Sequence, residues 1–220
     1  NIPNNILTEG RLVKGDTNTA FVKAFAIATG EIQTSFVEHA YIEPEAGYAI
    51  RIGDRIEITA CTQAPMMDRQ ECANILGIDL NAIRIIPSAC GGGFGGKLDV
   101  SIQPLLAIAA WELKQPVRGI FSRTESMISS TKRHPALVKA NAGADKSGKL
   151  LAIEMNVDFN TGAYASWGPT VADRVPVHGS GPYLVPNVQM HTRAIHTNAP
   201  PSGAFRGFGV PQAAMLQEQL

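Results

Sequence analysis

A glycine-rich segment near the middle of the chain constrains the fold most strongly. Residues 91–97 read Gly-Gly-Gly-Phe-Gly-Gly-Lys, so five glycines surround one phenylalanine. Because each glycine inside a helix or strand costs about 0.5–1 kcal/mol relative to alanine, neither element suits this segment. We predict a tight loop, hereafter the glycine loop, whose peptide N–H groups can approach a ligand closely because no Cβ atoms intervene.

Apolar residues flank the glycine loop on both sides. Residues 82–86 precede it and residues 100–113 follow it, which predicts the order strand, loop, helix. In that order, the free N–H groups and the positive dipole end of the helix would point at the loop. An anion or an electron-rich oxo group is the ligand that this arrangement favours.

Two nucleotide-binding motifs overlap the glycine loop. Residues 91–96 satisfy G-x-G-x-x-G, the dinucleotide fingerprint, but the next strand ends in Ser122-Arg123 where an acidic residue is expected. The P-loop pattern fits up to Lys97, but Leu98 replaces the Ser or Thr that holds Mg²⁺. We keep an NADP-binding domain as an alternative. A nucleoside-triphosphate site is disfavoured, because the hydroxyl that would hold its metal ion is missing.

The charge balance restricts the class of partner. The chain has 19 basic and 19 acidic residues, so it has no net field that would attract nucleic acid or an anionic membrane surface. No run of 18 apolar residues occurs and no signal-like segment opens the chain, so we expect a cytoplasmic location. The cysteines at 61, 72 and 90 lack C-x-x-C spacing, which indicates structural thiols rather than a zinc or iron–sulfur site.

Local patterns predict a mixed α and β fold, of the α+β class, with mixed sheets and packed helices. We expect the chain to form one large domain over 1–220 or two lobes, 1–130 and 131–220. Residues 1–10 look like a loop. The predicted helices lie at 19–25, 66–76, 100–113 and from Pro211 onward. The predicted strands lie at 26–35, 55–60, 117–121, 137–145, 150–159 and 188–196. Residues 146–149, Lys-Ser-Gly-Lys, predict a hairpin between the strands at 137–145 and 150–159.

A polar cluster is predicted from Glu38, His39 and Glu43. The spacing does not fit a helical H-E-x-x-H metal site, so we interpret these side chains as a hydrogen-bonded structural group.

A second glycine motif stands near the C-terminus, where residues 203–212 read Gly-Ala-Phe-Arg-Gly-Phe-Gly-Val-Pro-Gln. The two motifs, in this spelling and order, resemble those of the molybdenum hydroxylases, the family of xanthine dehydrogenase and aldehyde oxidoreductase. The segments 36–44, 62–65, 133–135 and 183–188 resemble family segments in the same order. The resemblance covers nearly the whole chain and implies the first molybdopterin-binding domain of such an enzyme.

The resemblance assigns cofactor contacts. Gln63 matches a glutamine that hydrogen-bonds an oxo ligand of molybdenum. Phe94, between Gly93 and Gly95, matches a residue whose backbone N–H is aimed at that oxo ligand. Arg206 matches an arginine beside the pterin. The resemblance implies that molybdenum is held through the pterin, in its plain or dinucleotide form, with no protein atom as a direct metal ligand.

The resemblance also assigns substrate contacts. Arg174 matches an arginine that faces the substrate and steadies negative charge on a purine ring in the transition state. Phe208 matches the ring that packs against a flat substrate. Leu98 replaces the substrate-binding glutamate of xanthine oxidases, with Asp99 beside it. This departure weakens the case for xanthine itself.

The implied reaction is hydroxylation of a purine-like nitrogen heterocycle, or of an aldehyde, with water as the oxygen source. Iron–sulfur clusters and FAD are expected only in other domains or subunits, and the general-base glutamate beyond Leu220. Both chain ends look like cuts, so we expect a fragment that does not turn over alone. A noncatalytic structural or assembly module that retains the glycine motifs is the alternative from another functional class.

Overall fold

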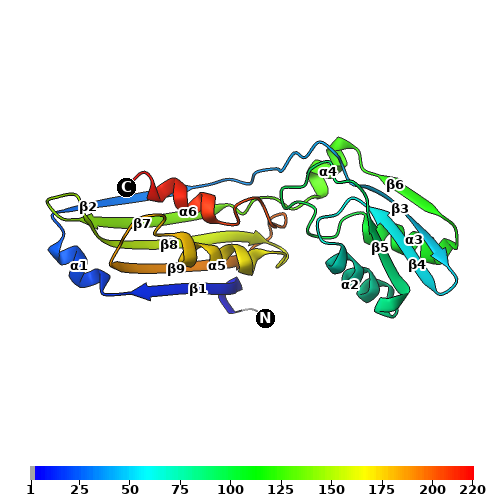
Figure 1. Ribbon diagram of the computed structural model, residues 1–220, viewed down its shortest axis with the longest axis horizontal. Coiled ribbons are helices and arrows are strands. Elements are labelled where there is room, and N and C mark those ends of the chain that lie inside the picture. Colours follow the sequence, from blue (N-terminus) through cyan, green and yellow to red (C-terminus); the bar gives the residue numbers. More distant parts are fainter. Residues whose placement is uncertain (1–2) are drawn as a thin grey trace. The chain divides into compact units, whose positions relative to one another are not determined.

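The computed structural model describes residues 3–220, which form two compact units (Figure 1). The five-stranded unit contains the described residues up to Val37 together with Lys132–Leu220, and the four-stranded unit contains Glu38–Thr131. This division differs from the expected lobes 1–130 and 131–220. The reason is that the N-terminal strands pair with strands from the C-terminal half of the chain.

The sheet of the five-stranded unit has the order β1-β9-β8-β7-β2. β8 and β9 run parallel and the other neighbours antiparallel, so the sheet is mixed. The hairpin predicted around residues 146–149 is formed by β7 and β8. The elements of this unit are a 3-10 turn (Pro3–Asn5), β1 (Ile6–Lys14), α1 (Thr17–Lys23), β2 (Ala26–Gln33), β7 (Ala136–Ala144), β8 (Leu150–Gly162), α5 (Gly168–His178), β9 (Asn187–His196) and α6 (Val210–Gln217).

Helices α5 and α6 pack on this sheet, with α5 on β1, β8 and β9 and α6 on β7 and β2. Alternate side chains of the central strands, such as Met155 and Met190, are fully buried against Val175 of α5 and Leu216 of α6. Burial of apolar surface stabilises such a core by roughly 25 cal/mol per Å².

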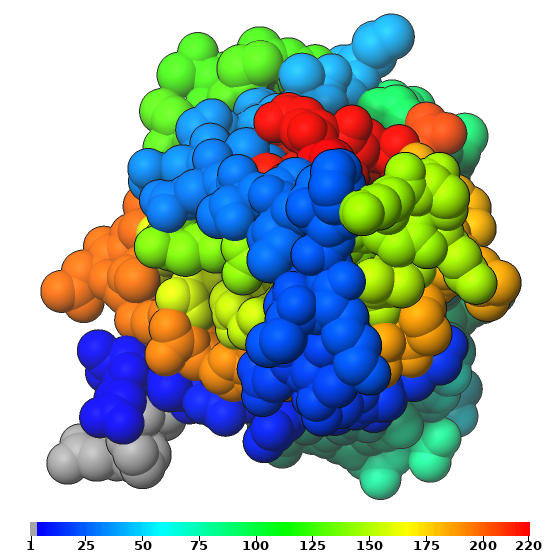
Figure 2. All heavy atoms as spheres, turned by 90° about the vertical axis from the view of Figure 1, so that its left-hand side faces the viewer, coloured from blue at the N-terminus to red at the C-terminus, as the bar shows by residue number. Residues whose placement is uncertain are grey.

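Helix α1 lies at one end of the five-stranded unit, between β1 and β2 in the chain. The Asp16 side chain caps it by accepting a hydrogen bond from the Thr19 N–H at 3.1 Å. Figure 2 looks onto this end, where α1, in blue, lies near the turn between β7 and β8. The Phe25 N–H, just past α1, donates to the Ala144 carbonyl at 2.8 Å and ties the two segments together.

The four-stranded unit has the sheet order β5-β4-β3-β6, with β4 and β5 parallel. Helix α2 makes the crossover between those two strands, and Gly77 ends it in the left-handed conformation with φ +65°. The elements are β3 (Ala46–Ile52), β4 (Arg55–Ala60), α2 (Pro65–Leu76), a 3-10 turn (Leu80–Ala82), β5 (Ile83–Pro87), α3 (Gln103–Leu113), β6 (Val117–Ile120) and α4 (Arg123–Ser129).

The predicted mixed α and β class is confirmed, because each sheet combines parallel and antiparallel pairs and helices pack on both. The loop predicted at residues 6–10 was wrong, because these residues belong to β1 and pair with β9. The predicted order strand, loop, helix is confirmed by β5, the glycine loop and α3. However, α3 begins at Gln103, six residues after Lys97, so the glycine loop does not lead directly into its N-terminus. Within residues 3–220, no helix combines the length and apolar character needed to cross a membrane.

Candidate functional site

The glycine loop follows β5 in the four-stranded unit and contains a tight turn at its centre. The Gly96 N–H donates to the Gly93 carbonyl at 2.8 Å across this turn. Phe94 and Gly95, between them, have φ of +53° and +105°, positive at both central positions as in a type I′ turn. The Phe94 side chain is 48% exposed at this turn, and the motif thus presents an aromatic ring to the surface of its unit.

Gln63, just past the end of β4, buttresses this turn. Its Oε1 accepts hydrogen bonds from the N–H groups of Gly95 at 3.0 Å and Lys97 at 3.3 Å. Because both loop groups are donors, the atom facing them must be the amide oxygen, and the Nε2 donor lies on the other side. A Cβ at Gly93 would overlap Gln63 Oε1, so only glycine admits this contact.

Three consecutive N–H groups of the glycine loop, those of Gly92, Gly93 and Phe94, are unpaired among the described residues. The same holds for the Nε2 group of the exposed Gln63 side chain. Runs of free backbone N–H groups make concave sites that bind anions or electron-rich oxygen atoms. The four-stranded unit therefore brings together Gln63, Gly92, Gly93 and Phe94 as hydrogen-bond donors that the described residues leave unpaired, whereas the Gly95 N–H is already bound to Gln63 Oε1.

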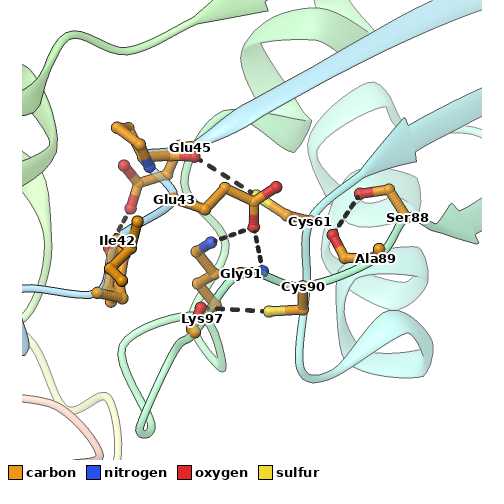
Figure 3. A network of polar contacts seen from close by, with 12 residues as sticks. Ile42, Glu43, Glu45, Cys61, Ser88, Ala89, Cys90, Gly91 and Lys97 are labelled. Atoms are coloured by element: carbon orange, nitrogen blue, oxygen red, sulfur yellow. Dashed lines mark hydrogen bonds and ion pairs between the residues drawn. The ribbon is translucent and has the colours of Figure 1, made fainter.

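The two ends of the glycine loop are joined through Glu43 (Figure 3). Glu43 Oε2 accepts from the Gly91 N–H at 2.7 Å and from Lys97 Nζ at 2.8 Å. Burial disfavours the Glu43 carboxylate, but the bonds to Lys97 and Gly91 outweigh it and lower the pKa of Glu43. Burial likewise opposes the Lys97 charge, but the bond to Glu43 outweighs it and raises the pKa of Lys97.

The predicted cluster of Glu38, His39 and Glu43 divides in the structure. Glu38 accepts from Ser130 Oγ at 3.2 Å, whereas Glu43 belongs to the glycine loop. Sequence spacing could not separate them, because their partners lie 48 and 92 residues away. Among residues 3–220, no three His, Cys, Asp or Glu side chains are grouped so that they could hold a metal ion.

Cys61, Cys90 and Asp99 lie close to the glycine loop, whereas Cys72 lies in α2. Cys61 and Cys72 are buried, as expected of structural thiols, but Cys90 is exposed and its Sγ lies 3.3 Å from the Gly92 carbonyl. Burial raises the pKa of Cys72 to about 12. Asp99 is half-buried two residues after Lys97.

The second glycine motif, in the five-stranded unit, contains a turn of the same type. The Val210 N–H donates to the Gly207 carbonyl at 3.1 Å, and Phe208 and Gly209 have φ of +48° and +85°. The Phe208 ring packs against Trp167, with ring centroids 6.0 Å apart and planes tilted by 46°. Such aromatic pairs add about 0.5–1.5 kcal/mol beyond their area burial, so this contact helps to fix the position of the Phe208 ring.

Arg206 and Arg174 lie on different segments of this unit, Arg206 in the second glycine motif and Arg174 on α5. Arg206 is exposed in the second glycine motif, two residues before Phe208. Arg174 is exposed on α5, seven residues beyond Trp167, which at 1.5 Å per residue is about 10 Å along the helix axis. The motif thus brings Arg206 and Phe208 together, while Arg174 lies further along α5 than the residue that Phe208 contacts.

Arg133 supports the second glycine motif, a role that sequence analysis missed. Its guanidinium carbon lies 3.8 Å from the centroid of the Phe205 ring, and NH2 donates to the Arg206 carbonyl at 2.8 Å. Burial lowers the pKa of Arg133. The only signal in the sequence was the Arg-His-Pro segment that begins at this residue.

His134 and Gln212 lie beneath the same motif. Gln212 Nε2 donates to the His134 carbonyl at 3.1 Å, and both residues are about 1% exposed. Burial lowers the pKa of His134 to about 4, so the ring is neutral at physiological pH. His134 is a core residue of this unit.

Several curated relatives match nearly the whole chain. It is 42% identical over 215 residues to the nicotinate dehydrogenase large molybdopterin subunit of Eubacterium barkeri, a match that covers 97% of this chain and 51% of that protein. It is 33% identical over 213 residues to the xanthine dehydrogenase of Oryza sativa subsp. japonica, a match that covers 94% of this chain and 16% of that protein.

The fold is similar to that of the aldehyde oxidoreductase from Desulfovibrio gigas. The TM-score is 0.89 at 27% sequence identity, over 98% of this chain and 25% of that chain. The chain thus spans about half the length of the nicotinate dehydrogenase protein and a quarter of the aldehyde oxidoreductase. All 220 residues match the family model of the molybdopterin cofactor-binding domain, and the chain therefore belongs to this family, the cofactor-binding part of the molybdenum hydroxylases.

Proposed function

We propose that the protein containing this chain is a molybdenum hydroxylase that oxidises an electron-poor carbon of a nitrogen heterocycle, with water as the oxygen source. The names of two relatives support this substrate class, because nicotinate and xanthine are both nitrogen heterocycles. Leu98 stands where the resemblance places the substrate-binding glutamate of xanthine oxidases, so we favour a heterocycle other than xanthine.

The donors of the glycine loop fit a molybdopterin. Gln63 Nε2 and the free N–H groups of Gly93 and Phe94 would hydrogen-bond the electron-rich oxygen atoms of such a cofactor. Arg206 would lie beside its pterin. When bound, the cofactor supplies the two-electron redox chemistry, and the chain supplies binding and orientation.

Arg174, Phe208 and Asp99 are proposed to face the substrate. The Arg174 guanidinium would stabilise negative charge that develops on a heterocyclic ring in the transition state, and for that reason we propose it as a catalytic residue. Phe208, packed against Trp167 and only partly buried, would present its exposed part to a flat ring.

The observation that carries the proposal is the orientation of Gln63. Its oxygen is used by Gly95 and Lys97, so its two amide hydrogens are available to a ligand. This arrangement suits an acceptor such as an oxo group and disfavours a cation.

The test uses the purified full-length protein. We expect about one molybdenum per active site by elemental analysis, turnover of nicotinate or a purine faster than of benzaldehyde, and incorporation of ¹⁸O from labelled water. If the purified protein contained no molybdenum, the proposal would be overturned, and the noncatalytic structural or assembly module would be the favoured alternative. Protection from thermal unfolding by NADP but not by molybdopterin would restore the dinucleotide alternative, although the absence of a helix directly after the glycine loop disfavours it.

A further inference from the structure

One carboxylate oxygen connects the entrance of the glycine loop with its exit. Glu43 Oε2 accepts from the Gly91 N–H, where the loop begins, and from Lys97 Nζ, where it ends. Figure 3 shows Glu43 between these two partners, with Cys61 and Cys90 nearby. A Cβ at Gly91 would lie 2.6 Å from the Glu43 Cβ, so glycine is required for this approach.

The Lys97 side chain is held in a buried position by this contact. It is 1% exposed, whereas Glu43 is 31% exposed, and the ammonium also lies 4.7 Å from the centroid of the Tyr41 ring. A buried ammonium needs a counter-charge, and the ring face contributes a weaker attraction. Loss of the Glu43 charge would therefore expel Lys97 from its place rather than leave it unpaired.

Lys97 is in turn joined to Gln63 through its main chain. The Lys97 N–H donates to Gln63 Oε1 at 3.3 Å, and the Gln63 N–H donates to the Lys97 carbonyl at 2.9 Å. The position of Lys97 thus sets the orientation of the Gln63 amide. The connection runs from the Glu43 carboxylate through Lys97 to the Nε2 group of Gln63.

We propose that Glu43 and Lys97 are positioning residues for molybdopterin binding, which tie the glycine loop into the shape that turns the Gln63 donor toward the cofactor. The proposal rests on the function proposed above. Neither side chain is assigned a contact with the cofactor or the substrate, and both act through Gln63 and the loop backbone.

The test compares Glu43→Gln and Lys97→Met with Glu57→Gln in the full-length protein. Glu57 is a matched control, because its ion pair with Arg84 spans 2.9 Å in the same unit but the cation of that pair is exposed. Three quantities are measured: hydrogen exchange of residues 91–98, the rate of molybdopterin loss after dilution, and the Mo(V) electron paramagnetic resonance spectrum, which reports the surroundings of the metal.

We expect Glu43→Gln and Lys97→Met to raise exchange in residues 91–98 and the rate of cofactor loss at least tenfold, and to alter the Mo(V) spectrum. Glu57→Gln should stay within twofold of the wild type. If Glu43→Gln does not accumulate as folded protein, Glu43→Gln combined with Lys97→Met removes the ammonium that has lost its counter-charge, and this double variant should fold. That double variant should show the same loosened loop.

A double-mutant cycle with Gln63→Glu separates positioning from general stabilisation. In the Gln63→Glu background, Glu43→Gln should change cofactor loss less than twofold while still raising exchange in the loop. Equal effects in both backgrounds would overturn the positioning role, and so would unchanged loop exchange in Glu43→Gln. Absence of molybdopterin from the wild-type protein would instead overturn the proposed function. In that case, hydrogen exchange of residues 91–98 would still show whether the contact between Glu43 and Lys97 orders the glycine loop.

Discussion

Phe94 and Phe208 adopt the same left-handed backbone conformation, with φ of +53° and +48°, in two turns that each continue into a glycine of positive φ. Each turn is closed by a main-chain hydrogen bond, of 2.8 Å around Phe94 and 3.1 Å around Phe208. This conformation costs an L-residue about 1–2 kcal/mol, and such strain is concentrated at functional sites. Both glycine motifs therefore hold an aromatic residue where glycine would be less strained.

The strain at Phe94 predicts that the glycine variant is more stable than the alanine variant, which is the reverse of the usual order. We expect Phe94→Gly to be more stable than Phe94→Ala by about 1 kcal/mol, because glycine adopts positive φ without the Cβ clash. Scanning calorimetry of the full-length protein measures the difference. At Phe25, which is exposed and has no positive φ, the alanine variant should be the more stable of the pair. The same order at both positions would contradict the strain at Phe94.

Gln63→Glu should separate folding from cofactor binding. The carboxylate can still accept from the Gly95 and Lys97 N–H groups, so the thermal midpoint should change little. It has no donor and carries a negative charge, so molybdenum content should fall at least tenfold by elemental analysis. Gln70→Glu, on an exposed part of α2, is the control and should keep its molybdenum. Full molybdenum content in Gln63→Glu would argue against a ligand role for the amide.

Arg133→Lys should loosen the second glycine motif. A lysine loses the planar stack on Phe205 and the fork geometry that reaches the Arg206 carbonyl, so we expect a loss of about 1–2 kcal/mol. Hydrogen exchange of residues 203–209 should rise.

Arg51→Lys is a matched control for that change. Arg51 stacks on Trp111 at 3.8 Å and donates to its carbonyl at 2.9 Å, so it loses the same kind of contact in the other unit. Its stability should fall without faster exchange at 203–209, and an equal increase in both variants would mean that the effect is not local to Arg133.

His134 should make the stability of the five-stranded unit depend on pH between 6.5 and 4. Its pKa falls from 6.5 to about 4 on folding because of burial, so in this window the unfolded state binds more protons than the folded one. Stability is then fully present above pH 6.5 and decreases as the pH falls, by on the order of 3 kcal/mol at about 1.4 kcal/mol per pH unit. His134→Gln should flatten this part of the profile in denaturant titrations, and an unchanged slope would show that other groups cause it.

Much of the local structure could be predicted from the sequence. Clean alternation marked β4 at Arg55–Ala60, the glycine after Leu76 marked the end of α2, and the turn residues 146–149 marked the hairpin of β7 and β8. These features depend on neighbouring residues, because side-chain direction and backbone freedom act over a few positions. The glycine motifs likewise carried the family assignment, while the roles of Gln63, Asp99, Arg174, Arg206 and Phe208 stay predictions.

Only the tertiary structure determined the features that depend on partners far apart in the chain. Residues 6–10 form part of β1 because they pair with β9, and local sequence patterns could not predict that pairing. Glu43 joins Gly91 and Lys97 across 48 and 54 residues, and Arg133 meets Arg206 across 73. A sequence shows which residues can donate, accept or carry charge. Only folding places a particular carboxylate beside a particular ammonium, because the energy of that contact depends on distance and burial.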